Sequence, residues 1–342
     1  MLTEVIKINP DNIDEESISR AAKLLTRGEL VAIPTETVYG LAANALDKTA
    51  VEAIFSAKGR PQDNPLIVHL ADKSWLSKYA AHIPRDAYKL IEAFWPGPLT
   101  IILKKSLIIP DVVSAGLDTA AFRLPSHPVA KAIIEAVGVP LAAPSANISG
   151  SPSPTTAAHV LSDLGGRIAA IVDGGECSVG VESTVVSLCG EIPTVLRPGG
   201  VTTEMLREVI GNVVIDAAVL NGLEDDAKAT SPGMKYKHYA PKAHVVIING
   251  EFNKIVNMVS AMGEGTTMLC FDGEEAIFNL PCVTYGARED SAEQARRLFD
   301  ALRRLDDIGA KTVYARCPAK TGMGLAVYNR LLRAAGFEVI EI

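Results

Sequence analysis

The sequence predicts an α/β protein with two domains, and three observations support this prediction. Its 342 residues exceed the usual size of one domain. Up to about residue 211, apolar strand segments and amphipathic helices follow one another with irregular spacing, which favours a mixed sheet. After a change in composition over 212–240, strands and helices alternate regularly, which indicates a small parallel sheet. We therefore predict domains at 1–211 and 242–342, joined by a linker at 212–241.

The first domain begins with a strand at 3–8 and an amphipathic helix from Asp14 to Arg27 that stops at Gly28. Asp47 can cap a helix that ends at Lys58. The segment 66–70 is apolar on both faces apart from one histidine, so it predicts a central strand. The other predicted elements are strands at 30–33, 99–103, 120–124, 140–143, 169–172, 183–188 and 194–197, and helices at 73–80, 84–94, 128–137 and 202–210.

The second domain has the pattern of a parallel α/β unit. No Gly-x-Gly-x-x-Gly follows its first strand, and it shows no catalytic constellation, so we interpret it as accessory. Its predicted strands lie at 243–248, 267–270, 282–285, 312–315 and 337–340, and its helices at 251–262, 291–308 and 322–335.

Composition excludes several classes of protein. A net charge of −7 and a pI near 5.5 argue against broad, sequence-independent binding to nucleic acid. There is no apolar run of about 18 residues, so we expect no membrane span, and the N-terminus lacks the pattern of a signal peptide. Five widely spaced cysteines without Cys-x-x-Cys predict reduced thiols rather than disulfides or structural zinc. We therefore expect a cytoplasmic protein.

The segment from Ser56 to His69 predicts one wall of an anion-binding site. The helix before it places Val51, Ile54 and Phe55 on one face, and Lys58 falls on the same face. A lysine that completes an apolar stripe either reaches to the edge of the helix or meets an anion. Pro61 restricts the backbone of Arg60 to extended conformations. The alternative is that both cations are solvated surface charges.

Two further cations and a loop rich in hydroxyl groups are expected at strand ends. Thr119 and Arg123 fall on one face of a strand, roughly 13 Å apart, and Arg197 precedes a Pro-Gly-Gly turn. The loop from Ser145 to Thr155 can offer hydroxyl and N–H groups to phosphate oxygens. Taken one at a time, these residues could equally be charges on an edge strand or parts of ordinary turns. Together they suit a polyanion such as a nucleoside triphosphate.

Several motifs in matching order resemble the YrdC-type threonylcarbamoyl-AMP synthases in their long two-domain form. The resemblance runs from about residue 15 to the C-terminus. It rests on Pro34–Leu41, Lys58–Pro61 with Asn64–Leu66, Trp95–Thr100, Ser145–Gly150, Ser183–Val186, Arg197–Gly199 and Ser231–Pro241.

The resemblance implies an enzyme that joins L-threonine, bicarbonate (or CO2) and ATP into threonylcarbamoyl-AMP and releases pyrophosphate. The product would feed threonylcarbamoyladenosine formation next to the anticodon of tRNA, through a separate transferase complex. It also implies a YrdC-like domain followed by a Rossmann-like domain. Mg2+ is expected through the ATP phosphates rather than in a protein cage.

The resemblance also assigns site residues. Threonine would be held by Thr35, His69, Arg123, Ser183 and the backbone near Ala143. ATP would be held by Lys58, Asn64, Thr119, Ser145, Ser153, Arg197 and, from the linker, Tyr236. The catalytic tetrad would be Lys58, Arg60, Ser145 and Asn147. On pattern alone His69 would be a core histidine, so its role here rests on the resemblance.

Two alternatives from other classes stay open at this stage. The domain could be a reader of tRNA or double-stranded RNA without synthase activity, or a carbamoyltransferase. Negative net charge and the complete threonine set disfavour the first, and the absence of cysteine clusters disfavours the second. Direct tRNA binding is undecided by the sequence. We further expect the linker to close over the pocket and exclude water from a labile mixed anhydride.

Overall fold

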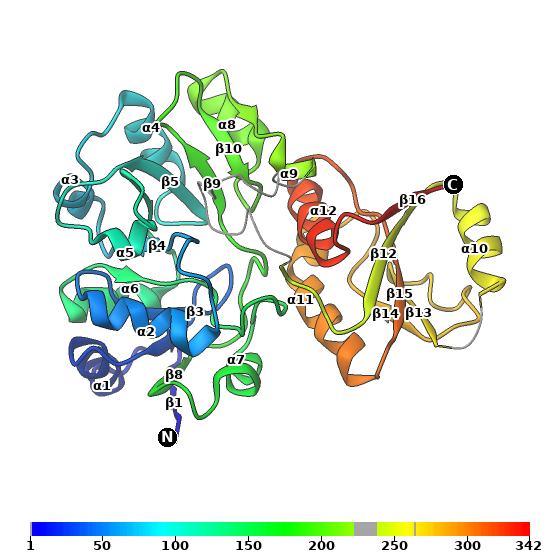
Figure 1. The fold of residues 1–342 in the computed structure, drawn as a ribbon, viewed down its shortest axis with the longest axis horizontal. Helices are drawn as coiled ribbons and strands as arrows, with labels where there is room; N and C mark the ends of the chain where they lie inside the picture. The colour runs from blue at the N-terminus through cyan, green and yellow to red at the C-terminus, as the bar shows by residue number, and fades with distance from the viewer. Residues whose placement is uncertain (1, 222–237, 263–264) are drawn as a thin grey trace.

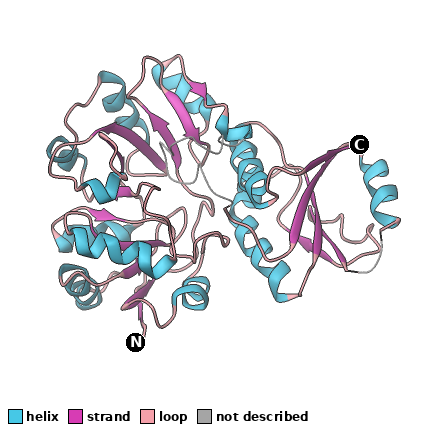
Figure 2. Cartoon of the chain, in the orientation of Figure 1, coloured by secondary structure: helices cyan, strands magenta, loops and turns pink. Residues whose placement is uncertain are grey.

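The computed structural model describes residues 2–221, 238–262 and 265–342 and contains two sheets, each in a domain of its own. Figure 1 shows the two domains side by side, with the N-terminus on the first and the C-terminus at the far edge of the second. Figure 2 shows that helices surround both sheets. Among the described residues, no helix combines the length and apolar character that crossing a bilayer requires.

The first sheet is mixed, as the irregular spacing of its elements predicts. Its order is β1-β8-β2-β3-β7-β4-β6-β5-β9-β10-β11, with parallel and antiparallel neighbours. The strands are β1 (Glu4–Lys7), β2 (Val31–Ile33), β3 (Gly40–Asn44), β4 (Ile67–His69), β5 (Leu99–Lys104), β6 (Thr119–Arg123), β7 (Leu141–Ala142), β8 (Ala170–Asp173), β9 (Thr184–Ser187), β10 (Thr194–Arg197) and β11 (Val214–Ile215).

The central strand of this sheet is β4, as predicted, and all three of its residues are buried. The helices of the first domain are α1 (Glu15–Thr26), α2 (Lys48–Lys58), α3 (Leu76–Tyr79), α4 (Arg85–Phe94), α5 (Asp111–Ser114), α6 (Pro128–Val137), α7 (Ala157–Leu164), α8 (Thr203–Ile210) and α9 (Ala218–Asn221), with a 3-10 turn η1 (Lys73–Trp75). Helices α1, α2, α4, α6 and α8 occur where the sequence predicts them, α5, α7 and α9 had no prediction, and α1 and α6 pack together.

The second sheet is parallel throughout, in the order β14-β13-β15-β12-β16. Its strands are β12 (His244–Asn249), β13 (Thr266–Cys270), β14 (Cys282–Thr284), β15 (Thr312–Arg316) and β16 (Val339–Glu341). The helices are α10 (Phe252–Ser260), α11 (Ser291–Asp307) and α12 (Gly322–Ala334). The α/β class with a mixed and a parallel sheet is therefore confirmed.

The second domain contacts the first through α11 and α12, which lie between the two sheets, whereas α10 lies on the outer side (Figure 1). The hydrophobic cluster under α11 and α12 includes Val38 and Val181 from the first domain. The cluster under α10 consists of residues of the second domain alone. The predicted division at 211 and 241 stays a prediction, and most of the linker lies outside the described residues.

Candidate active site

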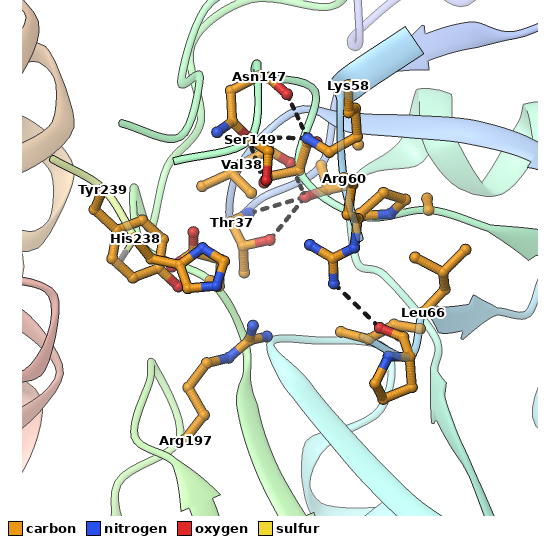
Figure 3. A pocket seen from close by; sticks show the side chains of 18 of the residues that line it. Thr37, Val38, Lys58, Arg60, Leu66, Asn147, Ser149, Arg197, His238 and Tyr239 are labelled. Carbon is orange, nitrogen blue, oxygen red and sulfur yellow. Dashed lines mark hydrogen bonds between the residues drawn. The ribbon is translucent and has the colours of Figure 1, made fainter. Parts of the chain in front are cut away.

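A pocket opens where the ends of several strands of the first sheet converge. The turn after β2, the end of α2, the strands β4 and β6, the loop after β7 and the end of β10 all contribute to it. His238 and Tyr239, which follow the linker, close one side. Figure 3 shows Arg60 and Arg197 directed into the same space, with His238 beside them.

The pocket brings together most of the predicted site residues. Nine of them line it: Thr35, Lys58, Arg60, His69, Arg123, Ala143, Ser145, Asn147 and Arg197. Sheet register explains one part of this assembly, because His69 on β4 pairs directly with Arg123 on the parallel strand β6. Their side chains therefore lie next to each other at the same end of the sheet.

Lys58 ends α2 on its buried face, as its place in the apolar stripe suggests, and is only 1% exposed. Its Nζ donates to the carbonyl oxygen of Ser145 at 2.6 Å and to that of Asn147, with the Asn147 Oδ1 at 3.4 Å. Burial, together with the nearby Arg60 guanidinium, lowers the pKa of Lys58. The lysine thus fixes the loop after β7 and does not lie on the surface.

The loop after β7 is held by its own side chains as well. The Ser145 hydroxyl donates to the Asn147 Oδ1 at 2.5 Å, and the Asn147 Nδ2 donates to the carbonyls of Ile148 and Ser151 at 2.8 Å each. In Figure 3 Asn147 lies beside Lys58 at one side of the pocket. Lys58, Ser145 and Asn147 therefore form one connected network.

The His69 side chain is buried and neutral. Burial, and then the charge of Arg123, lowers the pKa of His69 to about 3. Its Nδ1 lies 3.2 Å from the Ile67 carbonyl oxygen. An imidazole that donates from Nδ1 to this carbonyl has an acceptor at Nε2.

The Arg123 guanidinium is buried against a carboxylate. Its Nη2 lies 2.7 Å from the Glu36 Oε1, and both side chains are almost fully buried. The second oxygen, Glu36 Oε2, accepts from the Ser126 amide at 3.2 Å. Thr35, next to Glu36, donates from its hydroxyl to the Val38 carbonyl at 2.7 Å and so shapes the same turn.

Arg197 ends β10 and is buried in the opposite wall. Its Nε donates to the Ser183 carbonyl at 3.0 Å, and its Nη2 donates to the Ser183 Oγ at 3.1 Å. Burial lowers the pKa of Arg197 to about 10, so the guanidinium stays charged at neutral pH. Ser183 itself does not line the pocket and also shares a hydrogen bond with the Thr100 hydroxyl at 2.7 Å.

Three other predicted residues lie away from the lining, and a fourth is outside the described residues. Ser153 is buried and donates to the Glu182 carboxylate. Asn64 is 1% exposed, and within the described part of the chain neither polar atom of its amide has a hydrogen-bond partner. Thr119 begins the strand that Arg123 ends and is not among the lining residues. Tyr236, and with it most of the expected lid, lies outside the described residues.

Sequence reasoning gave no role to Glu36, Glu182, His238 or Tyr239, although all four belong to or adjoin this pocket. Glu36, His238 and Tyr239 lie inside motifs that carried the family resemblance, so the motifs did contain that signal. Glu182 directly precedes Ser183, and nothing in the local pattern marked it.

Two family models of known proteins match this chain, one after the other. The Sua5/YciO/YrdC family model, whose description is telomere recombination, matches residues 23–199. A second model, described as the C-terminal domain of threonylcarbamoyl-AMP synthase, matches residues 201–336.

Full-length relatives agree with the family models. A threonylcarbamoyl-AMP synthase of Pyrococcus abyssi is 45% identical, with 100% of each chain covered. One of Bacillus subtilis is 47% identical over 96% of this chain and 95% of its own. The crystal structure of P. abyssi Sua5 complexed with L-threonine superposes with a TM-score of 0.94 at 45% identity, covering 99% of this chain and 100% of that one.

Proposed function

The chain belongs to the family of threonylcarbamoyl-AMP synthases, and we propose that its pocket joins L-threonine, bicarbonate or CO2, and ATP into threonylcarbamoyl-AMP with release of pyrophosphate. One observation carries the proposal. Four cationic side chains, those of Lys58, Arg60, Arg123 and Arg197, line one pocket that also contains a neutral histidine. Such a pocket can bind two anionic reactants side by side.

Threonine would lie at the end of the pocket formed by β4 and β6. Arg123 is suited to its carboxylate, and the acceptor at His69 Nε2 is suited to its ammonium or hydroxyl group. Thr35 and the backbone at Ala143 line the same pocket. Ser183 remains a proposed threonine contact, and its hydroxyl accepts from the Arg197 Nη2 at 3.1 Å. These five residues form the proposed threonine subsite.

ATP would lie across the remaining cations. Lys58, Arg60 and Arg197 would face the phosphates, with Ser145 and Asn147 beside them. Asn64 remains a proposed ATP contact: its buried amide has no hydrogen-bond partner among the described residues, although it does not line the pocket. Ser153, Thr119 and Tyr236 remain proposed ATP contacts, although the Ser153 hydroxyl donates to Glu182. No group of three or more metal-ligating side chains occurs among the described residues, and Mg2+ would enter on the phosphates.

The proposed reaction needs no protein nucleophile; it requires that the pocket hold the two reactants in position. The neutral threonine amine adds to CO2, and its nitrogen releases a proton to water to leave a carbamate. A carbamate oxygen then attacks the α-phosphorus of ATP. The bond from that phosphorus to the bridging oxygen breaks, and pyrophosphate leaves with the electron pair. The tetrad Lys58, Arg60, Ser145 and Asn147 would hold both anions in contact and stabilise the charge on the departing group.

The setting of the reaction is a further proposal. We infer that the product is handed to a threonylcarbamoyl transferase complex that modifies tRNA, and that the enzyme works in the cytoplasm. Net charge of −7 does not favour broad contact with tRNA by this chain. The linker would still close the pocket, with His238 and Tyr239 at its end already among the lining residues.

The decisive experiment is an assay of pyrophosphate release from ATP with bicarbonate, in the presence and absence of L-threonine. We expect release that depends on threonine and produces threonylcarbamoyl-AMP, identified by mass. An RNA-binding module would release no pyrophosphate in this assay. A carbamoyltransferase would show no pyrophosphate release that depends on threonine.

A further inference from the structure

Glu182 is the only acidic residue among the described residues that line the pocket. It is 6% exposed and directly precedes Ser183, at the start of β9. A bare carboxylate here would repel the phosphates of ATP and cancel part of the charge of Arg197. Burial acts to raise the pKa of Glu182, but the Arg330 and Arg197 guanidiniums outweigh it and hold the pKa below its usual value.

The counter-ion of Glu182 comes from the second domain. Arg330 lies on α12, has no exposed side-chain surface, and donates from its Nε to the Glu182 Oε2 at 2.8 Å. Its Nη2 donates to the Glu182 backbone carbonyl at 3.0 Å. The guanidinium therefore binds both the side chain and the main chain of one residue in the pocket wall.

Arg330 also joins this residue to the turn after β10. Its Nη1 donates to the Pro198 carbonyl at 2.6 Å. The turn presses closely on the start of β9, because a Cβ at Gly199 would lie 2.4 Å from the Thr184 nitrogen and 2.6 Å from the Glu182 oxygen. Arg197 and Ser183, which are hydrogen-bonded to each other, lie between these two contacts in the chain.

The Arg330 guanidinium also lies close to Tyr239, which lines the pocket as well. Its Cζ is 5.8 Å from the centre of the Tyr239 ring, which packs in turn on Phe299 of α11 at 5.2 Å. Arg330 thus contacts Glu182, the turn at Pro198 and Tyr239 from the side away from the pocket.

We propose that Arg330 is a positioning residue through which the second domain completes the nucleotide subsite of the first, by neutralising Glu182 and holding the start of β9 against the turn after β10. This inference rests on the proposed function, because it assumes that the pocket binds ATP. It assigns a task to a domain that carries no catalytic constellation of its own.

The test separates charge compensation from mere packing with two variants and their combination. In Arg330→Met, the unpaired carboxylate should raise the KM for ATP by about tenfold or more, and the KM for threonine by less, because ATP carries more negative charge. Adding Glu182→Gln in the same chain should bring the ATP KM back to within about threefold of wild type, because the pair is then neutral. A double variant that binds ATP no better than Arg330→Met overturns the proposal.

A matched control is available in the same domain. The buried Arg316 forms an ion pair with the partly buried Glu274, with Nε to Oε2 at 2.9 Å, and neither lines the pocket. Arg316→Met should lower stability and leave both KM values unchanged. An equal rise in the ATP KM in Arg316→Met and Arg330→Met would show that the effect is general loss of stability and would overturn the proposal.

Arg330→Lys keeps the test decisive if Arg330→Met does not fold. Lysine retains the positive charge and loses most of the hydrogen bonds, so the ATP KM should stay within about tenfold of wild type. Arg330→Lys and the neutral double variant together give the comparison that the proposal needs. An ATP KM more than about tenfold above wild type in both variants would overturn the proposal.

ATP affinity measured by calorimetry provides the same comparison without turnover. Wild-type protein that binds ATP but releases no pyrophosphate would refute the proposed function and leave this inference testable.

Discussion

At the scale of single residues, the proposed threonine subsite depends on a buried ion pair. Arg123 and Glu36 are 2.7 Å apart and both almost fully buried. Removing one partner of such a pair leaves an uncompensated charge, which costs roughly 3–5 kcal/mol. Loss of Arg123 would therefore have two effects, one on ligand binding and one on folding, and a test must separate them.

Replacing Arg123 by Ala should raise the threonine KM strongly and also lower the free energy of unfolding, because Glu36 is left buried and unpaired. Adding Glu36→Gln should restore much of the stability without restoring the threonine KM. Steady-state kinetics and urea denaturation of the two variants measure these effects. A threonine KM that recovers together with stability would contradict a direct contact between Arg123 and threonine.

Protonation of His69 should make stability depend on pH below neutrality. Its folded-state pKa is about 3, against roughly 6.5 in an unfolded chain, so the unfolded state binds the extra proton between these values. The stability that this lowered pKa provides is full above about pH 6.5 and is lost as pH falls toward 3, by up to about 1.4 kcal/mol per pH unit. His238, whose pKa burial also lowers to about 3, adds an effect of the same sign.

The measurement is urea denaturation of wild type and His69→Gln between pH 7 and pH 4.5. The variant should show the shallower loss of stability with falling pH, and the exposed His82→Gln replacement serves as the control. Parallel curves for wild type and His69→Gln would contradict a neutral, buried His69.

Sequence patterns could identify residues of the pocket only where a motif contains them. Lys58 was marked by its place in an apolar stripe, and it is buried on that face. The pairing of Glu182 with Arg330 joins residues 148 positions apart in the chain, and no local pattern encodes it. Thr119 lies on the same strand as Arg123 but four residues away, at the other end of β6, and it does not line the pocket.

At the scale of elements, the strongest predictions were the long amphipathic helices and the apolar strands. The helix at 128–137 coincides with α6, and the strand at 194–197 with β10. Strand β3 had no prediction, since Gly40-Leu-Ala-Ala-Asn44 lacks β-branched residues and forms a strand through pairing with β2 and β7. The two-residue strand β11 was likewise too short to predict.

Helix α2 carries Lys58 to the pocket, and its start is fixed by Asp47. The Asp47 Oδ1 accepts from the amides of Thr49 at 2.9 Å and Ala50 at 3.2 Å. Asp47→Ala should lower the free energy of unfolding by about 0.5–2 kcal/mol through loss of this cap. Chemical denaturation measures the change, with the exposed Lys48→Ala as control. Equal stability of the two variants would contradict the capping role.

At the scale of the whole molecule, the two domains share a buried interface that reaches the pocket. Val38, a pocket residue, packs in the hydrophobic cluster of the second domain. The Arg303 guanidinium on α11 binds both carboxylate oxygens of Asp163, at 3.0 and 2.8 Å. The Asn329 Nδ2 on α12 donates to the Val219 carbonyl at 2.7 Å. We therefore expect docking of the domains and geometry of the pocket to be coupled.

Gly180 provides a direct test of this coupling. A Cβ there would lie 2.3 Å from the Arg296 Cα and 2.5 Å from the Ala295 carbonyl oxygen, both in the backbone of α11, so the helix must move away. Gly175 lies in the same loop between β8 and β9 and has a similar positive φ, but a Cβ added there would have no atom within 4 Å. Alanine at either position costs roughly 1–2 kcal/mol of backbone strain, and Gly180→Ala alone should also separate the domains.

We expect Gly180→Ala to increase the radius of gyration in solution scattering, to split or broaden the thermal unfolding transition, and to raise the ATP KM in the direction of Arg330→Met. The reason is that moving α11 withdraws α12 with it, since the two helices pack together, and Glu182 then loses its partner. Gly175→Ala should lower stability by a similar strain and keep the compact shape and the ATP KM. Identical scattering and kinetics for the two variants would mean that the pocket does not depend on how the second domain is docked.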